Sequence, residues 1–147
     1  MERLQTGAVS ENVEKNFLTH PNPQMRRKNY VNLNGSWDFS ITQDATLPME
    51  YNQTINVPYC PESQLSGVET EVLPGSYLFY RRMLNIPQLT GRVLLHIGAA
   101  DQIADIYVNQ NHCGNHVGGY NSFTVDITDS EGRTVAAVTV DGFIKRP

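Results

Sequence analysis

The chain has 147 residues, 39% of them hydrophobic and 18% charged, which predicts one globular domain and leaves no room for a large two-domain enzyme. Its formal net charge of -4 and its scattered Lys and Arg residues exclude a nucleic-acid partner, because phosphate binding needs a dense basic face. The short basic run at residues 26–28 is interpreted as a solvated segment before the first strand.

The cysteines and the amino-terminal residues bear on the compartment. Cys60 and Cys113 match no zinc-binding or disulfide pattern, so both are expected to be free thiols. Residues 1–16 carry acidic side chains and no apolar run, which predicts neither a signal peptide nor a membrane span. We therefore expect a cytoplasmic protein with no membrane partner.

In chain order, polar and aperiodic residues 1–20 predict a flexible tail, and residues 21–147 predict a β-sandwich domain. Short apolar or alternating runs separated by Gly, Pro, Asn and Asp indicate antiparallel strands. These runs lie at residues 35–41, 77–86, 92–97, 102–108, 113–117, 123–127 and 135–140, with turns expected at 109–111 and 129–132. About seven such strands predict an all-β jelly-roll β-sandwich, with a barrel as the alternative.

Two of the runs predict which side chains are buried. Residues 35–41 alternate, so one face is expected in the core and the other in water; Trp37, Phe39 and Ile41 form the first face and Ser36, Asp38 and Ser40 the second. Residues 77–86 are apolar on both faces and are expected to be covered on both sides.

No catalytic pattern is found in the sequence. A serine nucleophile elbow and phosphate-cradling glycine loops are absent, and Cys60 has no sequence relation to any histidine. Glycoside hydrolysis needs two carboxyl groups at a set separation, and nothing in the sequence pairs the carboxylates. We predict no catalytic residue and no cofactor.

One cluster, His112, Cys113 and His116, has metal-ligating side chains. In a regular strand His112 and His116 share a face while Cys113 points to the other, so the three cannot converge on one metal without a bulge. Cys113 is therefore expected to pack inward and both histidines to face water, and no metal is predicted.

The order of several short motifs resembles the sugar-binding-type domain that opens family 2 glycoside hydrolases such as β-galactosidases and β-glucuronidases. Residues 33–39 resemble the pattern LNGEWDF, and residues 57–67 are similar to the VPFCPES-LSG loop. The remaining matches, to WYRR, VLLHFGAVD, VYVNG and GGYxPFxxDIT, lie at residues 80–82, 92–101, 105–109 and 118–128.

The resemblance implies a galactose-binding-domain-like fold and a non-catalytic role, because the family's catalytic glutamates lie on a (β/α)8 barrel that has no counterpart here. That barrel of the parent chain would be the partner, together with carbohydrate, and the parent would hydrolyse a β-glycoside, with galactoside expected first and glucuronide next. Glu71 and Val72, with Asn121 and Ser122 as a second edge, are the candidates to approach a sugar. Structural roles fall to Trp37, Arg81, Arg82, Gly118 and Gly119.

The sequence departs from the family after Thr128, so we expect the domain to be truncated at its carboxyl end. An edge left open in this way would favour homo-oligomers. Two other functions stay open: a free-standing carbohydrate-binding module and a structural interaction domain without a ligand. The module would need a platform of exposed aromatic side chains or a polar cup, and the aromatic candidates near loops are Tyr51, Tyr59, Tyr77 and Tyr120.

Overall fold

A computed structural model describes residues 30–85, 92–127 and 137–145, and these fall into two compact units. Of the described residues, 30–37 and 54–71 belong to the first unit and the remainder to the second. The tail predicted over residues 1–20, the basic run at 26–28 and the turn at 129–132 lie outside the described residues.

The described chain is built of β-strands joined by turns, with a single short 3-10 helix among the described residues. The elements are β1 (Gly35–Thr42), β2 (Gln53–Val57), η2 (Gln64–Ser66), β3 (Tyr77–Asn85), β4 (Leu94–Ile97), β5 (Ile103–Val108), β6 (Asn111–Val117), β7 (Phe123–Asp126) and β8 (Ala137–Lys145).

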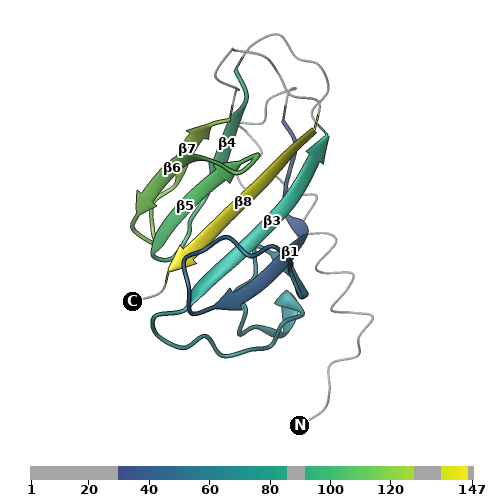
Figure 1. Ribbon diagram of the computed structural model, residues 1–147, viewed down its shortest axis with the longest axis vertical. Coiled ribbons are helices and arrows are strands. Elements are labelled where there is room, and N and C mark those ends of the chain that lie inside the picture. Colours follow the sequence, from purple (N-terminus) through teal and green to yellow (C-terminus); the bar gives the residue numbers. More distant parts are fainter. Residues whose placement is uncertain (1–29, 86–91, 128–136, 146–147) are drawn as a thin grey trace. The chain divides into compact units, whose positions relative to one another are not determined.

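The second unit contains two antiparallel sheets. Its strands pair in the order β1, β3, β8, β5, β6, while β4 pairs with β7 in a separate sheet. Figure 1 shows β8 running between β3 and β5, with β7 beside β6. The predicted all-β sandwich is confirmed by this arrangement.

Alternating burial along β5 identifies the two faces of the larger sheet. Ala104, Ile106 and Val108 are buried, whereas the residues between them are half-buried. Ile106 of β5 pairs with Gly142 of β8, and Gly142 pairs on its other side with Tyr80 of β3. Tyr80 in turn pairs with Phe39 of β1, so all four residues lie on the same face of the sheet. The rings of Phe39 and Tyr80 lie 5.0 Å apart in a tilted arrangement. We call this the inner face and the opposite one the outer face.

The two sheets of the second unit meet where β6 packs on β7. His116 stacks on Phe123 with ring centroids 4.3 Å apart. A Cβ atom on Gly114 would lie 3.0 Å from a methyl carbon of Val125, so a side chain at this position would require Val125 to shift by a few tenths of an ångström. The inner face of β6 therefore closes the sandwich by direct side-chain contact.

The prediction that β3 is covered on both faces holds for its first residues only, since Met83 further along is 72% exposed. Leu78 is 1% exposed and Phe79 is 0% exposed, although they point to opposite sides of the sheet. The prediction that Ser40 faces water is wrong: Ser40 pairs with Phe79 and is buried, and its hydroxyl group lies 3.2 Å from Oδ1 of Asn52. Ser36 and Asp38 are exposed as expected.

The last strand differs from its predicted bounds. β8 runs over Ala137–Lys145 where 135–140 was expected, and it lies between two other strands of the sheet. Residues 135 and 136 lie outside the described residues. The prediction that the domain is truncated stays a prediction.

Replacing Gly114 with alanine should lower the free energy of unfolding by about 1–3 kcal/mol, because the new methyl group would overpack against Val125. Urea unfolding of the purified chain measures this. Gly98→Ala is the matched control, since nothing lies within 4 Å of its Cβ position. Equal stability of the two variants would contradict the close packing of β6 on β7.

Candidate functional site

The loop before Glu71 is held by its own backbone and by one buried hydroxyl group. Ser63 caps η2, and the hydroxyl oxygen of Ser66 lies 2.7 Å from the carbonyl oxygen of Ser63 and 3.2 Å from that of Pro61. The N–H of Thr70 donates to the same Pro61 carbonyl at 3.0 Å. These bonds give the loop a defined shape in the first unit, and Glu71 is exposed at its end.

The predicted sugar-proximal residues fall in different parts of the chain. Glu71 ends the first unit, and half-buried Val72 begins the following segment of the second. Asn121 and Ser122 are neighbours, both exposed, in the connection between β6 and β7. Among the described contacts of the second unit, none joins Val72 to this connection. The assignment of the four residues to a sugar stays a prediction.

The turn that carries Asn121 has two glycines, and each position requires glycine for a different physical reason. Gly118 has φ 123° and donates its N–H to the carbonyl of Gln102 at 2.8 Å. Gly119 lies against Asp101, whose Oδ1 is 2.6 Å from the position that a Cβ atom would occupy. This turn presents Tyr120 with its side chain fully exposed.

The other predicted structural residues make local contacts. The indole N–H of Trp37 donates to the carbonyl of Leu33 at 2.8 Å, and the Trp37 side chain is half-buried. The guanidinium of Arg81 lies 4.2 Å from the ring centre of Tyr51, a cation–π contact within the second unit. Arg82 is half-buried on the inner face.

A bulge in the β5–β6 hairpin overturns the expected directions of the histidines. Tyr107 pairs with His112, but Ile106 pairs with Gly114, so Cys113 is the extra residue. Every residue after the bulge changes face, and His116 therefore lies on the inner face against Phe123, where its Nε2 is buried without a described partner. The prediction of two histidines on one face was wrong, as was that of an inward Cys113.

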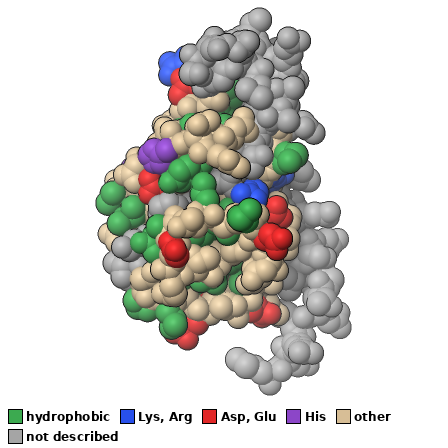
Figure 2. Space-filling model, viewed as in Figure 1, with side chains coloured by type: hydrophobic (Ala, Val, Ile, Leu, Met, Phe, Trp, Pro, Cys, Tyr) green, Lys and Arg blue, Asp and Glu red, His purple; other side chains and the backbone are tan. Residues whose placement is uncertain are grey.

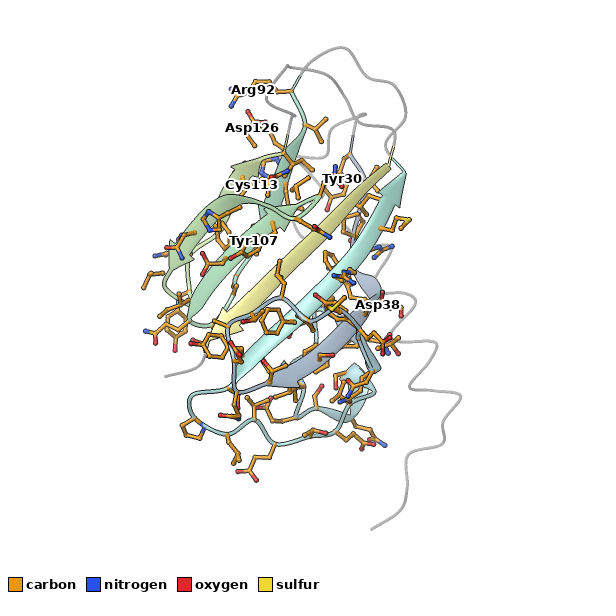
Figure 3. The ribbon with its side chains drawn as sticks, viewed as in Figure 1. Tyr30, Asp38, Arg92, Tyr107, Cys113 and Asp126 are labelled. Carbon is orange, nitrogen blue, oxygen red and sulfur yellow. The ribbon has the colours of Figure 1, made fainter. Side chains whose placement is uncertain are left out.

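Both cysteines are free and exposed, as predicted for their redox state. Figure 3 labels Cys113 on β6, where its thiol lies 3.3 Å from the carbonyl oxygen of Asn111. Within the described residues, no group of three or more His, Cys, Asp or Glu side chains could hold a metal ion.

The same bulge creates a polar cluster on the outer face that the sequence did not reveal. Nε2 of His112 lies 2.7 Å from Oδ1 of Asp105, and the amide of Asn115 donates to that same oxygen at 3.1 Å. The ring of His112 also meets Tyr107 edge-on, with centroids 5.1 Å apart. In Figure 2 a histidine side chain and an acidic side chain lie together on the viewed face. We call Asp105, Tyr107, His112 and Asn115 the outer-face cluster.

Part of this cluster could have been found from the sequence. Asn109 and Gln110 have φ values of 47° and 68°, the geometry of a two-residue hairpin turn, which fixes Val108 opposite Asn111 and Tyr107 opposite His112. The position of the bulge carries no such local signal, so the approach of Asn115 to Asp105 could not be derived.

The surroundings of the outer-face cluster change the pKa of the Tyr107 phenol. Its pKa is raised above the ordinary value of 10.0, first by desolvation and second by the neighbouring Asp105 carboxylate.

At the far end of the smaller sheet, Arg92 pairs with Asp126 at 2.8 Å (Figure 3). That pair is largely exposed, so its net contribution to stability is expected to be small, about 0–1 kcal/mol.

Comparison with known proteins shows that this sandwich is similar to parts of known glycosidases. The chain is 27% identical over 100 residues to a β-glucuronidase of Bacteroides fragilis, a match that covers 66% of this chain and 14% of that protein. It superposes on the β-glucuronidase of Faecalibacterium prausnitzii with a TM-score of 0.62 at 21% identity, over 77% of this chain and 20% of that one. No family model matches the chain.

Part of a β-D-mannosidase from Dictyoglomus thermophilum has the same fold, with a TM-score of 0.61 at 15% identity, covering 78% of this chain and 15% of that one. The described class is therefore an all-β sandwich of the kind that forms one part of these glycosidases. The resemblance to family 2 glycoside hydrolases is confirmed at this level. The chain spans 14%, 20% and 15% of the length of these three relatives. No helix among the described residues is long and apolar enough to cross a membrane.

Replacing Gly119 with alanine should force the Asp101 carboxyl group to move and should lower stability by about 1–3 kcal/mol. In an Asp101→Ala background the cost should shrink, because most of the crowding atoms are gone. A double-mutant cycle by urea unfolding measures the coupling. Purely additive costs would show that the turn does not depend on this contact.

The raised pKa of Tyr107 should make stability sensitive to alkaline pH. Above the ordinary pKa of 10.0 the unfolded chain releases this phenolic proton while the folded chain keeps it. The stabilisation is fully present below that pH and is lost as the pH rises through the folded pKa. Between about pH 9 and pH 11 the free energy of unfolding should therefore fall more steeply with pH for the wild type than for Tyr107→Phe. Parallel curves for the two proteins would refute the assignment.

Proposed function

We propose that this chain is a non-catalytic domain of a family 2 glycosidase that supports the catalytic domain and contributes a loop beside the sugar. The observation that carries the proposal is the extent of the matches: 77% of this chain aligns in fold with only 20% of a β-glucuronidase. A segment of that size in such an enzyme leaves most of the machinery to other parts of the chain.

The names of the relatives support a proposal for the substrate of the parent enzyme. The sequence relative and several solved structures are β-glucuronidases, and one is a β-mannosidase. We propose a β-glycoside, with glucuronide favoured. The galactoside expected from its frequency in the resembled family receives no support from these names, and the cytoplasmic location stays a prediction.

The supporting role is proposed for the exposed parts of the fold. Glu71 and Val72, together with Asn121 and Ser122, are proposed to lie at the rim of the sugar pocket in the parent enzyme. The (β/α)8 domain of the same chain is the proposed partner. A homo-oligomer remains a further proposal, for which the position of β6 at one end of the strand order is the supporting observation.

The test compares the isolated chain with the product of the complete reading frame that contains it in its native source. Purified residues 1–147 should not hydrolyse 4-nitrophenyl β-D-glucuronide above the buffer rate, because no acid–base pair is assigned to them. The complete product should hydrolyse it, with the corresponding galactoside and mannoside as substrate controls.

Turnover by the isolated chain would overturn the non-catalytic assignment. A complete product that cleaves no β-glycoside would overturn the glycosidase assignment. Cleavage of the galactoside in preference to the glucuronide would retain the domain proposal and reverse the substrate.

A further inference from the structure

The outer-face cluster is more than a chance meeting of polar side chains, because the bulge assembles it. Without Cys113 as an extra residue, the hairpin register would place Asn115 opposite Ala104 on the inner face. With it, Asn115 pairs with Asp105. Bulges interrupt the backbone ladder and commonly re-aim side chains next to functional sites. The interruption here places an amide, a carboxylate and an imidazole on one open face.

The hydrogen bonds inside the cluster determine what it can offer to a ligand. A carboxylate only accepts, so Nε2 of His112 carries the proton that it donates to Asp105. In the tautomer with its one proton on Nε2, Nδ1 is left as an acceptor. The amide nitrogen of Asn115 is used twice, by Asp105 and by the carbonyl of Ala104 at 3.3 Å, which leaves its Oδ1 as an acceptor. Oδ2 of Asp105 is a third acceptor. None of these three atoms has a hydrogen-bond partner among the side chains that the structure describes, which do not include those of β8.

The cluster is also reachable. The His112 side chain is 49% exposed and the Asp105 side chain 17% exposed, and Asn115 is exposed. Tyr107 is half-buried beside them and adds an aromatic ring to the same face. A set made of acceptors and one ring fits a ligand that donates several hydrogen bonds and carries no negative charge.

We infer that the outer-face cluster binds a neutral saccharide through its hydroxyl groups, with Tyr107 supplying apolar contact. The choice of a saccharide over another donor-rich ligand rests on the proposed function of the chain. The hydroxyl groups of a pyranose donate to Oδ2 of Asp105, Oδ1 of Asn115 and Nδ1 of His112. A uronate is disfavoured here because its carboxylate would approach the charge of Asp105.

The test is a titration of the 15N-labelled chain, observed through its amide resonances, with methyl β-D-glucopyranoside, methyl β-D-galactopyranoside, D-glucuronate and methylguanidinium. We expect saturable shifts in β5 and β6 with a neutral glycoside and much weaker ones with glucuronate. Asn115→Ala and His112→Ala should each weaken binding roughly tenfold, the effect of losing one or two hydrogen bonds. His96→Ala is the matched control, since His96 is also exposed and hydrogen-bonded, to Thr124 at 2.8 Å, but lies on β4.

Asp105→Asn keeps the shape of the side chain and is therefore expected to leave the fold intact. The amide resonances of β3 show whether each variant is folded. Absence of shifts in β5 and β6 with every glycoside would overturn the inference, as would equal binding of glucuronate. Binding of methylguanidinium alone would replace the saccharide by a cationic group. All of these outcomes leave the glycosidase activity of the complete product unaffected, so the two proposals fail in different assays.

Discussion

The pairing of β8 with both β3 and β5 is the constraint on which the second unit depends. β3 pairs with β8 from Tyr77 to Asn85, and the opposite side of β8 pairs with β5 from Ile103 to Val108. No other described strand joins these two parts into one sheet. The inner face becomes continuous only through this strand, because side chains on paired residues point the same way. The packing of the smaller sheet on β6 then follows from that face.

Much of the fold could be predicted because it depends on short-range patterns. Turn residues separated the strands, and alternation assigned Phe39 and Ile41 to one face of β1. Leu78 and Phe79 indicated a strand covered on both sides, and both are buried. The prediction that Ser40 faces water was wrong because its burial depends on Phe79 and Asn52, which are remote in sequence. Alternation cannot reveal a cover supplied by another segment.

The site was harder to predict than the fold for a related reason. A bulge of one residue reverses the face of everything beyond it, and Cys113 has no local feature that marks it as that residue. The sequence therefore assigned His116 to water, whereas it stacks on Phe123. The prediction that Glu71 and Asn121 approach a sugar came from a family resemblance. No contact among the described residues supports it independently.

The central position of β8 also governs the order in which the larger sheet can be completed. During synthesis, β3 and the β5–β6 hairpin leave the ribosome well before residues 137–145, so the strand that joins them arrives last. Until then both retain an unpaired edge, which exposes backbone donors and acceptors to other chains. Contacts so distant in sequence also make folding slow for a domain of this size. Until residues 137–145 are made, a nascent chain of this protein therefore exposes two strand edges that β8 later covers.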